Sequence, residues 1–224
     1  MLELYLDTAD ISQVARFNAC LPIRGVTTNP SILAKSGLGV RQLLPELASI
    51  LGSNARFHVQ AVSQTVDAII TEARQIAALP YDIVVKIPAT EIGLAAIKKL
   101  HAEQIPVLAT AIYTAHQGFL AALCGADYLA PYVNRIDVMG NDGIKVAADI
   151  QLLLDRHQLD SKLLPASFKN TQQVLDVLKI GVSAITLPTE LVAQMFGHPA
   201  VEPAVQQFTQ DWQAAFGDKF AFEV

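Results

Sequence analysis

Lys86 is the residue of this 224-residue chain with the clearest potential for chemistry. It interrupts the apolar run Ile83-Val84-Val85-Lys86-Ile87-Pro88. Such runs form strands buried on both faces of parallel sheets, and lysine is almost never fully buried without a partner or a task. Burial disfavours the ammonium form of an amine whose ordinary pKa is about 10.4. We therefore predict that Lys86 is a nucleophile that forms a Schiff base with a carbonyl substrate. The structural alternative is a strand-end lysine whose amine reaches out of the core and pairs with a carboxylate such as that of Asp7.

Polar residues also end six other short apolar runs of the chain. They are Asp7, Thr27 with Asn29, Gln60, Thr110, Tyr132 and Ser167. In barrels of alternating strands and helices, the active site lies where the strands end and the following loops begin. One such residue alone would be typical of a strand-end cap, but seven ends including Lys86 favour an active site. The eighth run, ending Thr186-Leu187-Pro188, offers one threonine.

Schiff-base chemistry also requires an acid/base group and hydroxyl ligands. Tyr132 is the candidate acid/base, with Gln60 and Thr110 able to hold a water beside it. The alternative for Tyr132 is a place in the core. Asp7, Thr27 and Asn29 offer the donors and acceptors that a polyhydroxy ketone needs. For all three residues the alternative is N-capping and turn formation, which suits the stretch Thr28-Asn29-Pro30-Ser31 because Pro30 can open a helix.

A phosphate site is predicted from three residues near the sixth and seventh strands. Arg135 follows the sixth, Ser167 ends the seventh, and Lys169 lies just beyond it. Barrels often bind phosphate at the loops after their last two strands. The alternative for Arg135 is an ion pair with Asp137.

The elements that must position these residues alternate along the chain. Eight short runs rich in β-branched residues are predicted strands: Leu2–Asp7, Gly25–Thr28, Arg56–Val62, Asp82–Pro88, Pro106–Ile112, Asp127–Val133, Lys162–Phe168 and Ala184–Pro188. Between them, helical spacing of apolar residues is clearest over Gln64–Leu79, Glu91–Glu103 and Gly143–His157. This alternation indicates βαβ units, and eight of them close into a single (β/α)8 barrel.

One domain is expected over residues 1–224, because no linker, low-complexity segment or charge run divides the chain. An extra helix is expected at about 199–216, beyond the eighth unit. Its apolar stripe consists of Val201, Val205, Phe208, Trp212 and Phe216. The stripe must pack either on the bottom of the barrel or on a neighbouring subunit.

Composition excludes several classes of function. With 52% hydrophobic residues and a net charge of −5, the chain is a poor candidate for nucleic-acid binding. No apolar run reaches the roughly 18 residues of a membrane span. Cys20 and Cys124 are far apart in sequence and suggest no disulfide framework, so a cytoplasmic location is expected. The five histidines lack metal-ligand spacing, and His58 is typical of a core residue. The chain also lacks a dinucleotide fingerprint and a P-loop.

Six stretches, in order from the first strand to the eighth, resemble the transaldolase family. They are Leu4-Tyr5-Leu6-Asp7-Thr8-Ala9, Gly25-Val26-Thr27-Thr28-Asn29-Pro30-Ser31, Val84-Val85-Lys86-Ile87-Pro88, Ala130-Pro131-Tyr132-Val133-Asn134-Arg135-Ile136-Asp137, Ala166-Ser167-Phe168-Lys169 and Ile185-Thr186-Leu187-Pro188. The short chain resembles the bacterial subfamily that includes fructose-6-phosphate aldolase.

The resemblance implies a barrel with the Schiff-base lysine at Lys86, no metal and no organic cofactor. It implies that Asp7, Thr27 and Asn29 contact substrate hydroxyls, that Arg135 and Ser167 bind phosphate, and that Lys169 is a less certain second phosphate ligand. Small members of this family assemble as pentamers, commonly paired into decamers. In these assemblies a C-terminal helix reaches a neighbouring subunit.

Within the family, two positions help to separate aldolases from transaldolases. Transaldolases of this type resemble one another in having Glu on the third strand and Phe on the sixth, where this chain has Gln60 and Tyr132. A phenol can protonate the enamine and release free ketone, whereas a phenyl ring cannot. We therefore expect an aldehyde lyase, a class I aldolase that cleaves fructose 6-phosphate to dihydroxyacetone and glyceraldehyde 3-phosphate. The nearest alternative is a transaldolase. More distant alternatives are a pyridoxal-phosphate barrel and a non-catalytic sugar-phosphate-binding barrel.

Three departures from the family pattern leave the physiological substrate open. They are Pro165 before Ala166-Ser167, Val138-Met139 after Asp137, and the transaldolase-like stretch His58-Val59-Gln60-Ala61.

Overall fold

The computed structural model describes residues 2–224. The chain forms two compact units, the first ending at Leu191 and the second spanning Val192–Val224. The first unit contains all eight strands and the helices that alternate with them. The single-domain organisation of the whole chain stays a prediction.

The first unit is a (β/α)8, or TIM, barrel, as predicted. Its strands are β1 (Glu3–Asp7), β2 (Ile23–Thr27), β3 (Arg56–Gln60), β4 (Asp82–Pro88), β5 (Val107–Ile112), β6 (Tyr128–Pro131), β7 (Lys162–Leu163) and β8 (Ala184–Leu187). All the pairs are parallel, in the order β7-β6-β5-β4-β3-β2-β1-β8. Thr186 N on β8 donates to Pro165 O, 3.2 Å away, just after β7, which brings the two ends of the sheet together.

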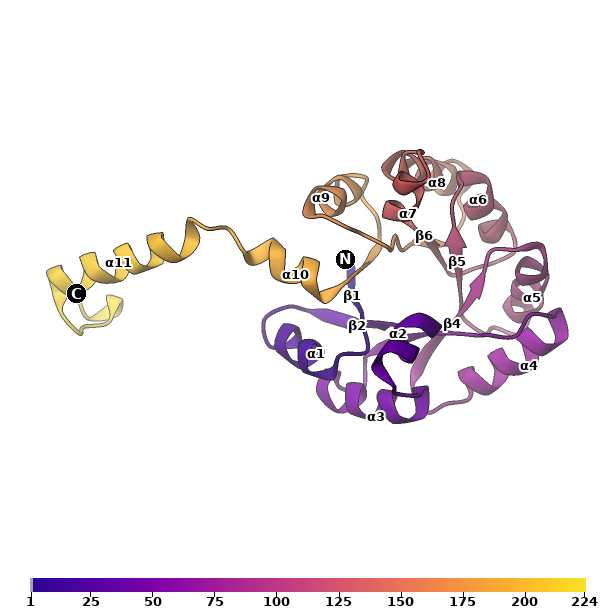
Figure 1. Cartoon of the computed structure of the whole chain (residues 1–224), viewed down its shortest axis with the longest axis horizontal. Helices are drawn as coiled ribbons and strands as arrows, with labels where there is room; N and C mark the ends of the chain where they lie inside the picture. Colours follow the sequence, from indigo (N-terminus) through magenta and orange to yellow (C-terminus); the bar gives the residue numbers. More distant parts are fainter. Residues whose placement is uncertain (1) are drawn as a thin grey trace. The chain divides into compact units, whose positions relative to one another are not determined.

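Helices surround the strands (Figure 1). Those of the barrel are α1 (Ile11–Asn18), α2 (Pro30–Ser36), α3 (Val40–Leu51), α4 (Val66–Ala77), α5 (Glu91–Ala102), α6 (Ala115–Leu123), α7 (Val133–Val138), α8 (Gly143–His157) and α9 (Thr171–Lys179). Helix α10 (Thr189–Phe196) crosses the boundary between the two units, and α11 (Val201–Phe216) and a 3-10 turn, Ala221–Glu223, lie in the second unit. The predicted helices over 64–79, 91–103, 143–157 and 199–216 are thereby confirmed.

Strand alternation divides the barrel interior into layers. On β1, every second residue from Glu3 through Tyr5 to Asp7 faces inward, while Leu6 faces the helices. The middle layer is apolar and aromatic. Its members are Tyr5, Val84, Leu108, Tyr128, Ala130, Leu164, Ala166 and Ala184, with Tyr132 packed on top. This layer closes the floor beneath the polar strand ends.

A charged network seals the opposite end of the barrel. The Glu3 carboxylate accepts hydrogen bonds from the hydroxyls of Tyr5 (2.7 Å) and Tyr128 (2.8 Å) and pairs with Lys162 at 2.6 Å. Arg56 pairs with Asp82 at 3.0 Å. The network therefore joins the first residues of β1, β3, β4, β6 and β7, which helps to fix the register of these strands.

Strand β2 approaches β3 unusually closely at Gly25. A Cβ atom at this position would collide with the Arg56 backbone oxygen, so only glycine fits. The pairing continues as Val26 opposite Phe57 and Thr27 opposite His58. The close approach thus brings the end of β2 level with the buried middle of β3.

The seventh strand is much shorter than the predicted run Lys162–Phe168. Regular pairing ends at Leu163, and an isolated bridge joins Ala166 to Tyr132. Pro165 has no N–H to donate, and Ser167 has a left-handed backbone with φ of 60°. Both features interrupt the ladder, which explains why the apolar pattern overestimated the length of this strand.

His58 lies in the core, as expected, with unusual polarity for its surroundings. Its ring is fully buried and makes edge contacts with Tyr5 (4.7 Å between ring centroids) and Tyr128 (5.1 Å). Neither ring nitrogen has a hydrogen-bond partner. Burial, and to a lesser degree the charge of Lys86, holds the pKa of His58 well below its ordinary value of 6.5.

The second unit contains the predicted C-terminal helix, α11. Its Trp212 Nε1 donates to Lys219 O at 2.7 Å, and the Trp212 ring lies 4.7 Å from that of Phe216. Val201, Val205 and Phe208 are exposed. The surface on which the stripe docks stays a prediction.

We predict that His58→Phe removes an acid-labile element from the core. Below pH 6.5 the unfolded chain binds a proton that the native ring excludes. As the pH decreases below 6.5, this group therefore lowers the unfolding free energy of the wild type by about 1.4 kcal/mol per pH unit, until the pH reaches the native pKa of His58. Urea unfolding at pH 7.5, 6.0 and 5.0 should show the variant gaining on the wild type as pH falls. The exposed His116, changed to Gln, is the control. A difference that does not vary with pH would contradict the prediction.

Candidate active site

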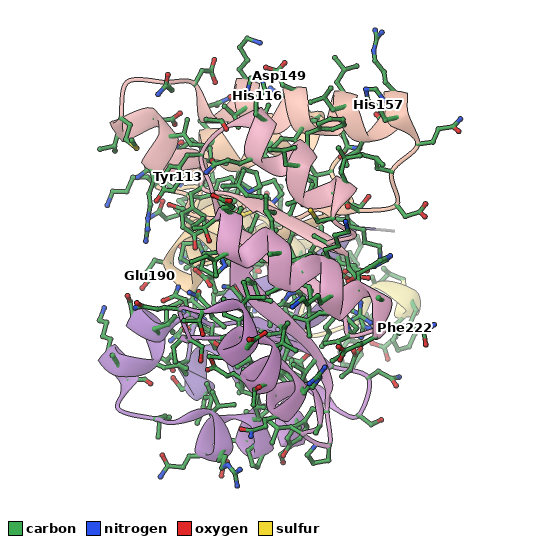
Figure 2. All side chains as sticks on the ribbon, turned by 90° about the vertical axis from the view of Figure 1, so that its right-hand side faces the viewer. Tyr113, His116, Asp149, His157, Glu190 and Phe222 are labelled. Carbon is green, nitrogen blue, oxygen red and sulfur yellow. The ribbon has the colours of Figure 1, made fainter. Side chains whose placement is uncertain are left out.

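The carboxyl ends of the strands enclose a polar cup. It is lined by Asp7, Thr27, Asn29, Lys86, Leu108, Thr110, Ala130, Tyr132, Arg135, Leu164, Ala166, Ser167 and Thr186. Residues from every strand except β3 and β7, and from the loops that follow, contribute to it. In Figure 2, Tyr113 after β5 and Glu190 after β8 mark this face of the barrel, and His157 at the end of α8 lies on the opposite side.

Lys86 lies in the floor of the cup and is 5% exposed. Its Nζ donates a hydrogen bond of 2.6 Å to the backbone oxygen of Thr28. Among the described residues 2–224 no carboxylate forms an ion pair with it, so the alternative of a Lys86–Asp7 pair is wrong. Burial lowers the pKa of the amine from 10.5, although the charge of Asp7 acts in the opposite direction.

A chain of hydroxyls connects three strands on one side of the cup. Thr27 Oγ1 donates to Asp7 Oδ1 at 2.6 Å and lies 2.8 Å from Thr186 Oγ1. Thr27 and Thr186 are both buried. Because the three side chains come from adjacent strands β2, β1 and β8, their bonds fix the orientation of the Asp7 carboxylate.

Tyr132 provides a phenol on another side. Its hydroxyl lies 2.8 Å from Thr110 Oγ1, and its ring packs on the middle layer. Burial raises the pKa of Tyr132 above 10, while the hydrogen bond with Thr110 and the charge of Arg135 partly oppose this shift. The phenol is therefore protonated at neutral pH and available as an acid.

A bulge in β5 places Thr110 against the tyrosine. Pairing with β6 shifts register between Ala109 and Ile112, and Ala111 has a left-handed φ of 56°. Bulges of this kind re-aim side chains beside active sites. A left-handed alanine costs about 1 kcal/mol, which the surrounding pairing must offset.

Arg135 lies at the rim, one helical turn after Tyr132. Its guanidinium carbon is 4.7 Å from the centroid of the Tyr132 ring, and interaction with Tyr113 raises the pKa of Arg135. Asp137 instead accepts bonds from Gly143 N (2.7 Å) and Gln173 Nε2 (2.6 Å). Among the described residues no Arg135–Asp137 ion pair forms, so that alternative is also wrong.

The structure brings together eight of the ten predicted site residues. Asn29 has two roles, since it lines the cup and its Oδ1 also accepts from Ile32 N at 3.0 Å as the N-cap of α2. Gln60 and Lys169 do not line the cup. Gln60 pairs in register with Lys86, whereas Lys169 is exposed and its backbone N donates to Gln173.

Sequence reasoning gave Thr186 little weight. Its position could have been predicted, because Thr186 lies two residues after Ala184 and alternate residues of β8 face the interior of the barrel. Thr28 was missed as well, because it acts through its backbone oxygen and a backbone acceptor leaves no trace in residue type.

Among residues 2–224, no group of three or more His, Cys, Asp or Glu side chains is arranged to hold a metal ion. None of the helices described combines the length and hydropathy needed to cross a membrane. A buried amine, a protonated phenol and several hydroxyls in one cup suit carbonyl chemistry through an imine.

Comparison with known proteins agrees with this class of site. A model of the family described as transaldolase/fructose-6-phosphate aldolase matches residues 4–224. The chain therefore belongs to this family of Schiff-base enzymes that act on sugar phosphates.

Solved structures similar to this chain show the fold alone. Thiamine phosphate pyrophosphorylase from Pyrococcus furiosus is 20% identical with a TM-score of 0.51, over 84% of this chain and 85% of that one. A flavocytochrome b2 variant with sulfite bound is 11% identical with a TM-score of 0.58, over 84% of this chain and 56% of the other. A further flavocytochrome b2 variant, with benzoylformate, is 12% identical with a TM-score of 0.60, over 84% and 57%.

We predict that Lys86→Met is more stable than the wild type at pH 7 by about 1 kcal/mol. The variant replaces a buried amine with an apolar methionine side chain of similar volume. The pKa of Lys86 is below 10.5 in the native protein and returns to about 10.5 in the unfolded chain. Between these two pKa values the unfolded chain binds more protons than the native protein, so wild-type stability rises with pH in that range. The advantage of the variant should therefore shrink between pH 7 and 10 in urea unfolding. Lys98→Met, on the exposed side of α5, is the control. An advantage that stays constant over this range would contradict a lowered Lys86 pKa.

Proposed function

We propose that the protein is a class I aldolase that reversibly cleaves fructose 6-phosphate to dihydroxyacetone and glyceraldehyde 3-phosphate. The observation that carries this proposal is the position of Lys86, whose buried amine shares one cup with the Tyr132 phenol. Burial favours the neutral amine, which is the form that attacks a carbonyl.

The reaction begins when the lone pair of Lys86 Nζ attacks the C2 carbonyl of the ketose. The carbonyl oxygen leaves as water and the nitrogen remains in a protonated imine. A base then takes the C4 hydroxyl proton, the C3–C4 bond breaks, and its electron pair flows into the iminium to form an enamine. Glyceraldehyde 3-phosphate leaves at this point. Protonation of the enamine carbon and hydrolysis of the resulting imine release dihydroxyacetone and regenerate the free amine.

We propose that Tyr132 moves these protons. Its phenol gives its proton to the hydroxyl that departs as water when the imine forms, and the resulting phenolate takes the C4 hydroxyl proton through a water and returns it to the enamine carbon. The Tyr132 hydroxyl is within hydrogen-bond distance of Thr110, so the two side chains can hold a water at the reacting carbon. Gln60, which is opposite Lys86 on the neighbouring strand, is proposed to help hold this water. Asp7 assists the proton transfer or orients the amine, since Thr27 fixes its carboxylate and its charge acts on Lys86.

The substrate would extend across the cup from the hydroxyls to the cation. Asp7, Thr27 and Asn29 offer partners to the ketose hydroxyls, and Arg135 and Ser167 line the side suited to phosphate. Lys169, which does not line the cup, is proposed only as an outer phosphate ligand that acts through long-range attraction.

The hydroxyl of Tyr132 favours aldolase over transaldolase. In a transaldolase the enamine must survive until an aldehyde acceptor arrives, so a proton donor beside it is a disadvantage. Here a phenol that burial keeps protonated lies in the same cup as the amine. Gln60 in place of a carboxylate is consistent with the same outcome.

We further propose a cytoplasmic homo-oligomer, a pentamer or a decamer. Exposed apolar residues of the second unit, including Val201, Val205 and Phe208, support an assembly in which a neighbouring subunit covers them.

Lys86→Met is predicted to abolish both turnover and imine formation. The test is to incubate protein with dihydroxyacetone and borohydride and to measure the mass of the Lys86 peptide. The wild-type peptide should gain the mass of the reduced adduct, and the variant should not. Fructose 6-phosphate binding without an adduct would indicate a non-catalytic barrel, and a yellow protein bleached by reduction would indicate pyridoxal phosphate.

Tyr132→Phe is predicted to shift activity from cleavage toward transfer, because the enamine loses its proton donor. Release of glyceraldehyde 3-phosphate from fructose 6-phosphate is measured with and without erythrose 4-phosphate. The wild type should release it without the acceptor, together with free dihydroxyacetone, and the variant should lose about tenfold or more of this activity. The variant's release with the acceptor should fall less. A wild type that requires the acceptor would be a transaldolase.

A further inference from the structure

The amine of Lys86 is held by a residue that does not line the cup. Thr28 directly follows β2 and is 3% exposed. Its backbone oxygen accepts the 2.6 Å hydrogen bond from Lys86 Nζ. At such a short distance the acceptor fixes the direction in which one N–H of the amine points.

Thr28 itself is fixed to β3 by two hydrogen bonds. Its backbone N donates to His58 O at 3.0 Å, and its hydroxyl donates to the same oxygen at 3.2 Å. The close approach of the two strands at Gly25 brings Thr28 within reach of His58. The side-chain bond therefore adds a second tie to the residue whose carbonyl holds the catalytic amine.

The carbonyl has a use throughout the proposed reaction. While the amine is free, one N–H is donated to Thr28 O, so the lone pair is turned away from that oxygen and is available to the substrate. Once the imine has formed, its nitrogen is the same Nζ atom and carries one N–H and a positive charge. A carbonyl at this distance accepts that N–H in a charge-assisted bond and stabilises the electron sink on which C–C cleavage depends.

We propose that Thr28 is a positioning residue for the Schiff base, in which the backbone carbonyl accepts the N–H of the Lys86 iminium and the side-chain hydroxyl, bonded to His58 O, holds that carbonyl in place. This inference rests on the proposed function. It assigns the hydroxyl of Thr28 an effect on imine chemistry, although Thr28 is not among the residues that line the cup.

Other charged and titratable groups also act on this nitrogen and must be kept constant in a test. Asp7 on β1 and His58 on β3 interact with it electrostatically, and Tyr132 after β6 and Arg135 on α7 line the same cup. Substitution of Thr28 leaves all four in place.

The experiment compares Thr28→Val, which has nearly the same shape without a hydroxyl, with Thr28→Ser, which retains it. Thr189→Val is the matched control, because Thr189 is also a buried threonine at this end of the barrel but does not line the cup. Trapping of the dihydroxyacetone imine by cyanoborohydride is followed from pH 6 to 9, together with kcat and KM for fructose 6-phosphate.

Thr28→Val is expected to lower the trapping rate and kcat by about tenfold, with KM changed less than about twofold. Its trapping profile should move to lower pH, because a loosened acceptor stabilises the protonated amine and the protonated imine less. Thr28→Ser should stay within about twofold of the wild type, as should Thr189→Val.

Wild-type rates and an unshifted profile in Thr28→Val would overturn the inference, and so would an equal loss in Thr28→Ser or in Thr189→Val. If Thr28→Val does not fold, Thr28→Ala takes its place in the same comparison. A wild-type protein that is not trapped at all with dihydroxyacetone would instead mean that the proposed function is wrong.

Discussion

The fold must hold a lysine amine inside a barrel without a counter-ion in contact with it. An ammonium ion in that position would need a paired carboxylate, and Lys86 has a backbone carbonyl instead. This arrangement shifts the balance toward the neutral amine while keeping the nitrogen anchored. The polar strand ends above the amine and the aromatic layer below it both follow from this constraint. The site needs hydroxyls to bind a substrate and an apolar, water-free floor beneath the nitrogen.

The two ends of the barrel meet opposite electrostatic needs. At the bottom, Glu3, Lys162, Arg56 and Asp82 are paired, so their charges are satisfied within the protein. At the top, Asp7 is tied through hydroxyls and Arg135 lies over an aromatic ring, so both keep capacity for a ligand. One set of alternating strands supplies both ends, because residues two apart on each strand point into the same interior.

Much of this could be predicted from the sequence where local pattern and tertiary structure agree. Strand 82–88 and helix 143–157 match their predictions residue for residue, since each has an uninterrupted pattern and clear ends. The seventh strand was overestimated because Pro165 and the left-handed Ser167 break pairing inside an apolar run. The acceptor of the Lys86 amine could not be predicted, because a sequence shows candidate carboxylates but hides backbone acceptors.

The contact between β8 and the end of β7, which closes the sheet, lies beside the cup. Thr186 N bonds to Pro165 O where β7 has already ended, and two cup residues, Thr186 and Ser167, lie on either side of that contact. A ligand that contacts both Thr186 and Ser167 would connect the two edges of the sheet at this point. Binding of such a ligand would then stabilise the contact between β7 and β8, so that the substrate would add to the closure of the barrel.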